Sequence, residues 1–163
     1  MDRLVPVLLL VLVFLLLLGL MVIGWRGRRR SQQHLPAPDS RDLAALGEQR
    51  AAGPFDGVYV DTVLAEQPLE RVVAHGLGQR ATASVEVGEQ GTWHIRRQGL
   101  APLTVPSSAL AEITTSPGMA GKFVGGDGLL VLRWRLGDQL LDTGLRLARR
   151  ADHDLLLSRK EHA

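Results

Sequence analysis

Residues 129–147 read LLVLRWRLGDQLLDTGLRL, and this stretch decides the fold class. Apolar and polar side chains alternate on both sides of a central Gly-Asp pair, which is typical of two half-buried strands joined by a tight turn. In this register Trp134 lies opposite Leu141, and Arg133 lies opposite Asp142 on the solvent face. The inward side chains of the hairpin are predicted to be Leu130, Leu132, Trp134, Leu136, Leu141, Thr143, Leu145 and Leu147.

The same alternation appears upstream, in residues 80–87 and 92–97, which a Glu-Gln-Gly loop joins into a second hairpin with Val87 opposite Trp93. Further extended segments are predicted at 57–64, 103–105 and 110–115. Seven strands with Gly and Pro at their joints indicate a mainly β domain, a seven-stranded antiparallel sandwich or partly open barrel. We expect its core to contain Val58, Val60, Val85, Trp93, Ile95, Leu130, Leu132, Trp134, Leu141 and Leu145.

Two short helices should accompany these strands. Residues 68–75 are predicted to be helical, with Leu69, Val72 and Val73 turned toward the core. Asp152 is a suitable N-cap for a final helix over 153–161, whose leucines would cover an open end of the barrel.

The N-terminal residues 4–25 are almost wholly apolar, and no charge occurs between Arg3 and Arg26. At about 1.5 Å per residue this run gives roughly 33 Å of helix, which predicts a transmembrane helix. A cleaved signal peptide is the alternative. The run is longer than a usual signal-peptide core, and no small-x-small site precedes the arginines, so the uncleaved anchor is favoured.

The basic residues near this helix are unevenly placed. One arginine precedes the apolar run, whereas Arg26, Arg28, Arg29 and Arg30 follow it and would lie at the membrane surface. The positive-inside rule then places the N-terminus outside and the remaining chain in the cytoplasm, on a single-pass protein of the plasma membrane. The predicted organisation is an extracytoplasmic N-terminus at 1–3, a transmembrane helix at 4–25, a basic juxtamembrane segment and linker at 26–53, and a cytoplasmic β domain at 54–163.

The β domain itself is nearly neutral. From residue 54 onward twelve Lys and Arg residues accompany thirteen Asp and Glu residues. A nucleic-acid-binding domain would need a strong excess of positive charge, so nucleic acid is not expected as a partner.

A glycine-rich loop at 117–128 surrounds Lys122. It is not a phosphate-binding P-loop, because Phe123 stands where that motif needs Ser or Thr. Backbone N–H groups of glycines beside one lysine are nevertheless suited to an anionic head group. The candidate ligands are Lys122, Gly121, Gly125 and Gly126, but a plain connection between strands is the favoured role of this loop.

Other motifs favour structural explanations. The string GLGQRA at 76–81 matches a dinucleotide fingerprint, but a helical segment precedes it and a strand follows, the reverse of what that site requires. The serines at 107–108 lie outside any nucleophile elbow, His94 is on the polar face of a strand, and no histidine pair has zinc-ligand spacing. We expect neither an enzyme nor a bound cofactor or metal.

Four strings together point to a known family: FDGVYV at 55–60, RVVAHGLG at 71–78, GKFV at 121–124, and WRLGD at 134–138 with LDTG at 141–144. They resemble an actinobacterial family of small membrane proteins with a pleckstrin-homology-like (PH-like) domain, often labelled transporter or export protein and commonly encoded among pyrimidine-biosynthesis genes. The resemblance implies one N-terminal span and a cytoplasmic seven-stranded barrel capped by a C-terminal helix. It implies no activity and no binding residues.

Two functions follow as hypotheses. The first is a membrane-anchored, non-enzymatic adaptor whose PH-like domain recruits a protein partner at the lipid bilayer. The alternative is a domain that senses an anionic lipid or a phosphate ligand through Lys122 and its glycines. A transporter is disfavoured, because one helix without an intramembrane polar residue offers no substrate path.

Overall fold

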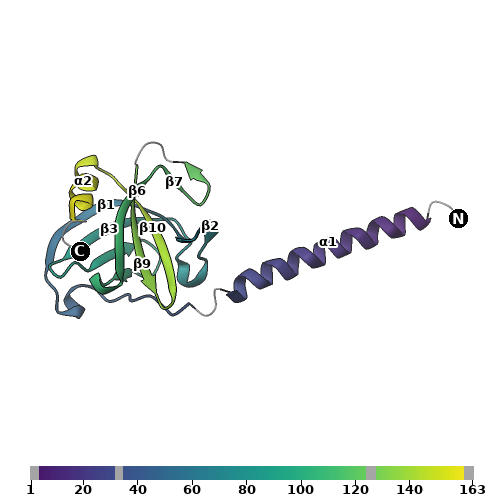
Figure 1. The fold of residues 1–163 in the computed structure, drawn as a ribbon, viewed down its shortest axis with the longest axis horizontal. Coiled ribbons are helices and arrows are strands. Elements are labelled where there is room, and N and C mark those ends of the chain that lie inside the picture. Colours follow the sequence, from purple (N-terminus) through teal and green to yellow (C-terminus); the bar gives the residue numbers. More distant parts are fainter. Residues whose placement is uncertain (1–3, 32–34, 124–127, 160–163) are drawn as a thin grey trace. The chain divides into compact units, whose positions relative to one another are not determined.

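The computed structural model describes residues 4–31, 35–123 and 128–159. The chain forms two compact units, Met1–His34 and Leu35–Ala163. The first unit contains the helix α1 (Leu4–Ser31), and the second contains the β domain (Figure 1). The predicted domain began at residue 54, whereas the compact unit begins at Leu35.

The prediction of a transmembrane helix at 4–25 is corrected. In the parts of the chain that the structure describes, no helix is both long and apolar enough to cross a membrane. The single-pass plasma-membrane location with its N-terminus outside is therefore not supported.

The second unit is built on one main sheet. Its path runs β5-β4-β3-β1-β10-β9-β6, so the seven predicted strands are present, and β2 pairs with β1 beside this path. A separate ribbon is formed by β7 and β8. The strands are β1 (Arg50–Leu64), β2 (Gln67–Arg71), β3 (Ala81–Gly88), β4 (Trp93–Arg97), β5 (Leu103–Val105), β6 (Leu110–Ser116), β7 (Gly118–Met119), β8 (Lys122–Phe123), β9 (Leu129–Leu136) and β10 (Gln139–Leu147).

Most connections between these strands are short, and two of them contain single-turn 3-10 helices, at Ala74–Gly76 and Ser107–Ala109. A third 3-10 helix, Ala44–Leu46, precedes β1. The predicted registers of both hairpins are confirmed. Trp134 pairs with Leu141, Arg133 pairs with Asp142, and Val87 pairs with Trp93. Period-2 patterning therefore specified the pairing of these strands correctly.

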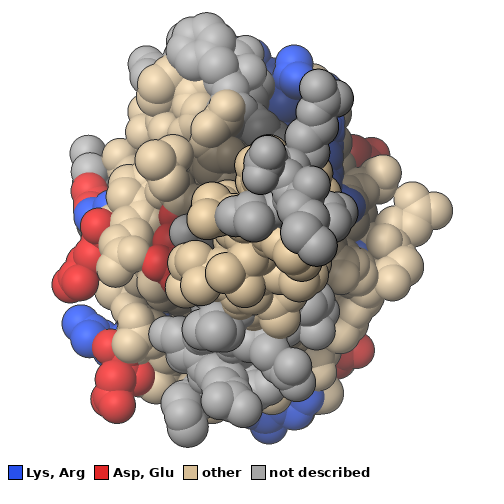
Figure 2. Space-filling model, turned by 90° about the vertical axis from the view of Figure 1, so that its right-hand side faces the viewer, with Lys and Arg blue, Asp and Glu red and all other residues tan. Residues whose placement is uncertain are grey.

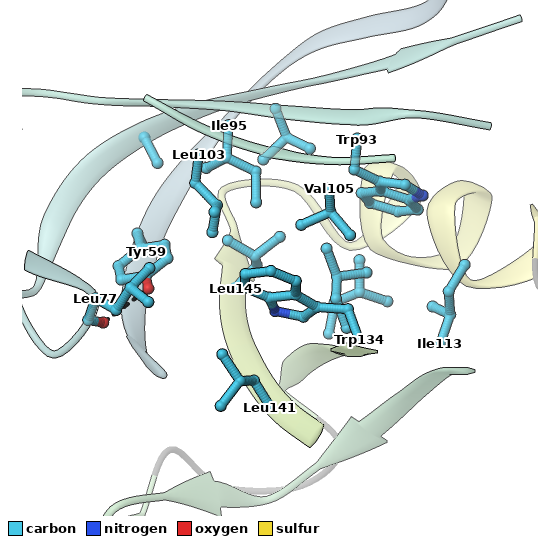
Figure 3. Close-up of a cluster of buried hydrophobic side chains, with 14 of the residues drawn as sticks. Tyr59, Leu77, Trp93, Ile95, Leu103, Val105, Ile113, Trp134, Leu141 and Leu145 are labelled. Carbon is cyan, nitrogen blue, oxygen red and sulfur yellow. Dashed lines mark hydrogen bonds between the residues drawn. The ribbon is translucent and has the colours of Figure 1, made fainter. Parts of the chain in front are cut away.

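The inner face of the sheet encloses the main hydrophobic core, in which Trp134 and Leu145 lie near the centre (Figure 3). The predicted core residues on β3, β4, β9 and β10 are all buried there. The prediction for β1 was off by one residue. Tyr59 points into this core, whereas Val58 and Val60 belong to a second cluster, because an irregularity in the β1–β10 register falls between Tyr59 and Asp61.

A chain of hydrogen bonds crosses this core. The Trp134 indole N–H donates to the Thr143 hydroxyl at 2.9 Å, and the Thr143 and Thr62 hydroxyls lie 2.7 Å apart. Thr62 bonds in turn to the Tyr59 hydroxyl, which donates to the Leu77 carbonyl at 2.7 Å. Because the Trp134 N–H can only donate and the Leu77 carbonyl can only accept, the intermediate protons run from Thr143 to Thr62 and from Thr62 to Tyr59. The buried hydroxyls of Thr143, Thr62 and Tyr59 are thus all hydrogen-bonded.

The predicted helix at 68–75 is wrong. Residues 67–71 form β2, which pairs with β1, and only a single 3-10 turn follows at Ala74–Gly76. Of the three residues predicted to face the core, Val72 is buried, but Leu69 and Val73 are exposed. Pairing with the long strand β1 supplies the backbone hydrogen bonds that a one- or two-turn helix would have had to form alone.

Residues 35–49, here called the N-terminal strap, pack onto the β domain rather than serving as a tether. Leu35 and Leu43 are buried, and the Thr104 amide of β5 donates to the Asp39 carbonyl at 2.7 Å. The Glu48 carboxylate accepts the Gln90 amide in the β3–β4 turn at 2.6 Å. The strap is therefore part of the folded domain.

His94 lies buried under this strap and not, as predicted, on a solvated face. Its Nδ1 is 2.9 Å from the Thr104 hydroxyl, which donates to the Arg41 carbonyl of the strap at 2.6 Å. Burial lowers the pKa of His94, since the imidazolium loses its hydration.

The C-terminal helix α2 (Arg150–Ser158) begins three residues before the predicted start. Leu156 is buried in the main core, which confirms that the helix packs on the barrel, while Leu155 is 48% exposed. Asp152 lies inside the first turn, where it accepts from Arg149 at 2.9 Å, and is not the N-cap.

Candidate functional site

A second apolar cluster covers the outer face of the sheet, opposite the main core. It consists of Val60, Val63, Met119, Leu129 and Val131, with Val58 and Ala120 packed against it. Met119 comes from the β7–β8 ribbon, which folds back over β10. A Cβ at Gly144 would lie 2.9 Å from the Met119 sulfur, so the missing side chain at Gly144 permits this close packing.

Between this ribbon and the β1–β2 hairpin lies a groove of about 500 Å³, here called the outer groove. Val63, Thr114 and Val131 form its floor, because they project from the outer face of paired strands. One wall is Pro68 and Leu69 of the hairpin, and the other is the segment from Ser116 to Gly121. The groove is thus lined mainly by apolar atoms from three separate stretches of sequence.

Leu69 is the most exposed large apolar side chain of the β domain among the described residues, at 82% exposure. Single exposed leucines are ordinary, but this one stands beside an apolar groove. Its hairpin is held down by an ion pair: the buried Asp61 carboxylate lies 2.7 Å from Arg71 Nε. Asp61 also accepts the Thr62 amide at 3.0 Å. These contacts fix the position of the Leu69 wall.

One end of the outer groove is polar. Arg133 donates two hydrogen bonds to Asp142, at 2.8 and 2.9 Å, and its Nη1 lies 3.6 Å from a Glu112 oxygen. The Asp142 hydrogen bonds raise the pKa of Arg133, so this guanidinium stays charged. Arg133 and Asp142 both line the groove, which therefore combines an apolar floor with a charged end.

The predicted anion ligands are only partly described. Gly121 borders the outer groove with a left-handed φ of 76°, and the backbone of Lys122 lies in β8. The Lys122 side chain and residues Gly125 and Gly126 lie outside the described part of the chain. The anion site therefore stays a prediction.

The predicted membrane-surface residues Arg26, Arg28, Arg29 and Arg30 belong to α1 by their backbone, and their side chains likewise lie outside the described residues. In the view of Figure 2 the basic and acidic side chains lie in small separate groups rather than in one large patch of either sign. This agrees with the near-neutral charge expected of the β domain.

The other sequence motifs have structural roles. Gly76 has a φ of 67° in the turn that leads toward β3, so the GLGQRA string is a turn and not a cofactor loop. Within the described segments, no group of three or more His, Cys, Asp or Glu residues is placed to hold a metal ion.

The sequence did not predict the outer groove. Its floor and walls come from segments that are far apart in the chain. In addition, Leu69 was predicted to lie in a helix and to face the hydrophobic core. One signal was present: Leu69 and its neighbour Pro68 lie between Glu66 and Glu70, an apolar pair in an otherwise polar hairpin.

A seven-stranded antiparallel sheet path with a C-terminal helix packed on its core is the architecture expected of a PH-like domain. The family model described as "Bacterial PH domain-like" matches residues 32–161, and the chain belongs to this family. No curated protein and no solved structure matches the chain. The PH-like part of the predicted resemblance is thus confirmed, and the match includes the strap as part of the domain.

Proposed function

We propose that this protein is a non-catalytic binding domain that recruits a protein partner through the outer groove. Its PH-like family is typically non-catalytic and suits a binding or adaptor role. The observation that carries the proposal is the 82% exposed Leu69 beside an apolar groove of about 500 Å³.

The groove has the physical properties of a side-chain pocket. Its volume falls within the range of small-ligand sites, about 300–1,000 Å³, and is large enough for one or two bulky side chains. Burying one Leu or Phe of a partner contributes about 1.5–3 kcal/mol, and covering Leu69 adds apolar area on this side. Such a central apolar contact is what a protein-binding hot spot requires.

Both walls of the groove are also anchored to the sheet. The Asp61–Arg71 ion pair fixes the hairpin wall, and Met119 packs the ribbon wall against β10. A pre-organised groove loses little conformational entropy when it is filled, which favours binding.

Photo-crosslinking tests this proposal directly. A benzophenone amino acid is placed at position 69 in the full chain, and a control chain carries it at position 155 on α2, where Leu155 is also exposed. We expect position 69 to capture one reproducible partner segment that position 155 does not. That segment, made as a synthetic peptide, should bind the wild-type chain and bind Leu69→Ser at least about tenfold more weakly.

Two results would contradict the proposal. One is the absence of any reproducible product at position 69. The other is a captured segment whose peptide binds wild type and Leu69→Ser equally well.

A further inference from the structure

We propose that the outer groove selects partner segments in which a large apolar side chain lies next to Lys or Arg. This inference rests on the proposed function and deepens it by assigning the chemistry of the partner. The apolar floor accounts for the first half of the specificity, and the charges around the groove account for the second.

The described carboxylates around the groove outnumber the guanidinium groups. Two basic side chains are described beside the groove. Arg133 lies at its polar end, and Arg71 lies beneath its hairpin wall. Arg133 binds Asp142 through two hydrogen bonds, and Arg71 pairs with the buried Asp61. Asp142 lines the groove, Glu66, Glu70 and Glu112 are its neighbours, and Asp61 is buried beneath the hairpin wall.

The placement of these acids matters more than their number. Glu66 and Glu70 flank Pro68 and Leu69 along the chain, so they accompany the apolar wall. Glu112 lies on β6, opposite Arg133 of the neighbouring strand β9, and its side chain is 39% exposed. It is therefore close to the Arg133–Asp142 pair at the polar end of the groove. A cation beside an apolar side chain in the groove would therefore meet acidic groups at the hairpin wall and at the polar end.

An anionic ligand would meet the opposite situation. A phosphate or carboxylate in this groove would approach a locally negative surface whose arginines already hold Asp61 and Asp142. Like-charge contacts weaken binding and reject wrong partners. The groove should thus distinguish basic from acidic segments that share the same apolar residues.

The test uses three short synthetic peptides with blocked ends and a fluorescent label. The first has Leu and Phe between lysines, the second has glutamates in place of the lysines, and the third has serines in place of Leu and Phe. Fluorescence anisotropy with the full chain measures each affinity. We expect the Leu/Phe–Lys peptide to bind at least about tenfold more tightly than either of the others, and added salt to reduce its affinity.

Matched variants locate the binding. Leu69→Ser and Glu112→Lys should each weaken the Leu/Phe–Lys peptide at least about fivefold. Leu155→Ser and Glu89→Lys change an exposed leucine and an exposed glutamate elsewhere and should leave its affinity unchanged. Glu66→Lys, on the exposed turn before β2, is a second charge reversal that repeats the test if Glu112→Lys disturbs the sheet.

The inference is overturned if the glutamate peptide binds as tightly as the lysine peptide, if the groove variants bind like wild type, or if no peptide binds. The same holds if vesicles of anionic phospholipid bind the chain in a Leu69-dependent manner. None of these results removes the proposed function, which fails only if crosslinking at position 69 yields no Leu69-dependent protein segment.

Discussion

At the scale of single residues, the hydrogen-bonded chain from Trp134 to Leu77 is the most demanding feature of the core. A buried hydroxyl without a partner costs about 1–3 kcal/mol, so each member depends on the next. The sequence predicted that Trp134 and Thr143 face inward, because both follow the period-2 pattern. It did not predict that Tyr59 completes the chain, because the irregularity after Tyr59 interrupts the alternation in β1.

Tyr59 is the only tyrosine of the chain, so its ionisation can be followed by ultraviolet absorbance. Burial is the main cause that raises the pKa of its phenol to about 12. Because the folded pKa lies above the unfolded value of about 10, the stabilisation is complete below pH 10 and is lost as the pH rises toward 12. We expect a phenolate transition above pH 11 in the native protein. A transition near pH 10 without unfolding would show that Tyr59 is exposed.

Trp134→Ala should be far more damaging than Arg133→Ala. Removing Trp134 leaves a cavity and takes one hydrogen-bond donor from the Thr143 hydroxyl, which keeps its bond to Thr62, at a cost of about 3–5 kcal/mol. Arg133 is 34% exposed, so its pair with Asp142 contributes about 0–1 kcal/mol. Urea titrations of both variants measure the two losses in free energy of unfolding. Equal losses would contradict the assigned burial of the hairpin faces.

At the scale of elements, the sequence was most informative where strands are long and strictly alternating. The hairpins β3–β4 and β9–β10 were predicted with their registers, since one face of each is apolar throughout. The segment 67–76 was not, because a short run containing Leu69, Val72 and Val73 fits a helix and a hairpin equally well. Tertiary pairing with β1 decided the outcome.

The Asp61–Arg71 ion pair makes a prediction for the β1–β2 hairpin. Arg71→Ala leaves the buried Asp61 carboxylate without this cation, so we expect a loss of about 3–5 kcal/mol of stability. The double variant Arg71→Leu with Asp61→Asn should recover part of this loss, because no buried charge remains. Thermal unfolding followed by circular dichroism checks both. If Arg71→Ala were as stable as wild type, the Asp61–Arg71 pair would not anchor the hairpin.

At the scale of the whole molecule, the strap explains why the domain boundary could not be read from composition. Residues 35–49 resemble a linker in their Pro and polar content, yet Leu35, Leu43 and Glu48 are buried against the sheet. Those contacts join segments that are 40 or more residues apart, as for Gln90 with Glu48, and no local pattern announces them. The outer groove escaped prediction for the same reason.

Truncation tests the strap. The fragment 35–163 should fold cooperatively, whereas 54–163 lacks two buried leucines, the Glu48 contact and the first residues of β1. Each buried leucine is worth about 1.5–3 kcal/mol, so the shorter fragment should lose most of the stability of a small domain. Urea unfolding of both fragments measures the difference. Equal urea midpoints for the two fragments would mean that residues 35–53 are only a linker and do not stabilise the domain.

The strap also makes stability depend on pH through His94. Its folded pKa lies below the unfolded value of about 6.5, so the contribution is fully present above pH 6.5 and is lost as the pH falls through the folded pKa. When the free energy of unfolding is measured as a function of pH, His94→Asn should reduce the loss of stability below pH 6.5. If the variant lost stability below pH 6.5 to the same extent as wild type, His94 would not be the group responsible.

The central claim is that the outer groove binds a protein segment through Leu69. Isothermal titration of the segment captured at position 69 against the wild-type chain, Leu69→Ser and Leu155→Ser tests it most directly. The account predicts that Leu155→Ser binds like wild type and that Leu69→Ser binds at least about tenfold more weakly. Equal affinity for all three chains would contradict it.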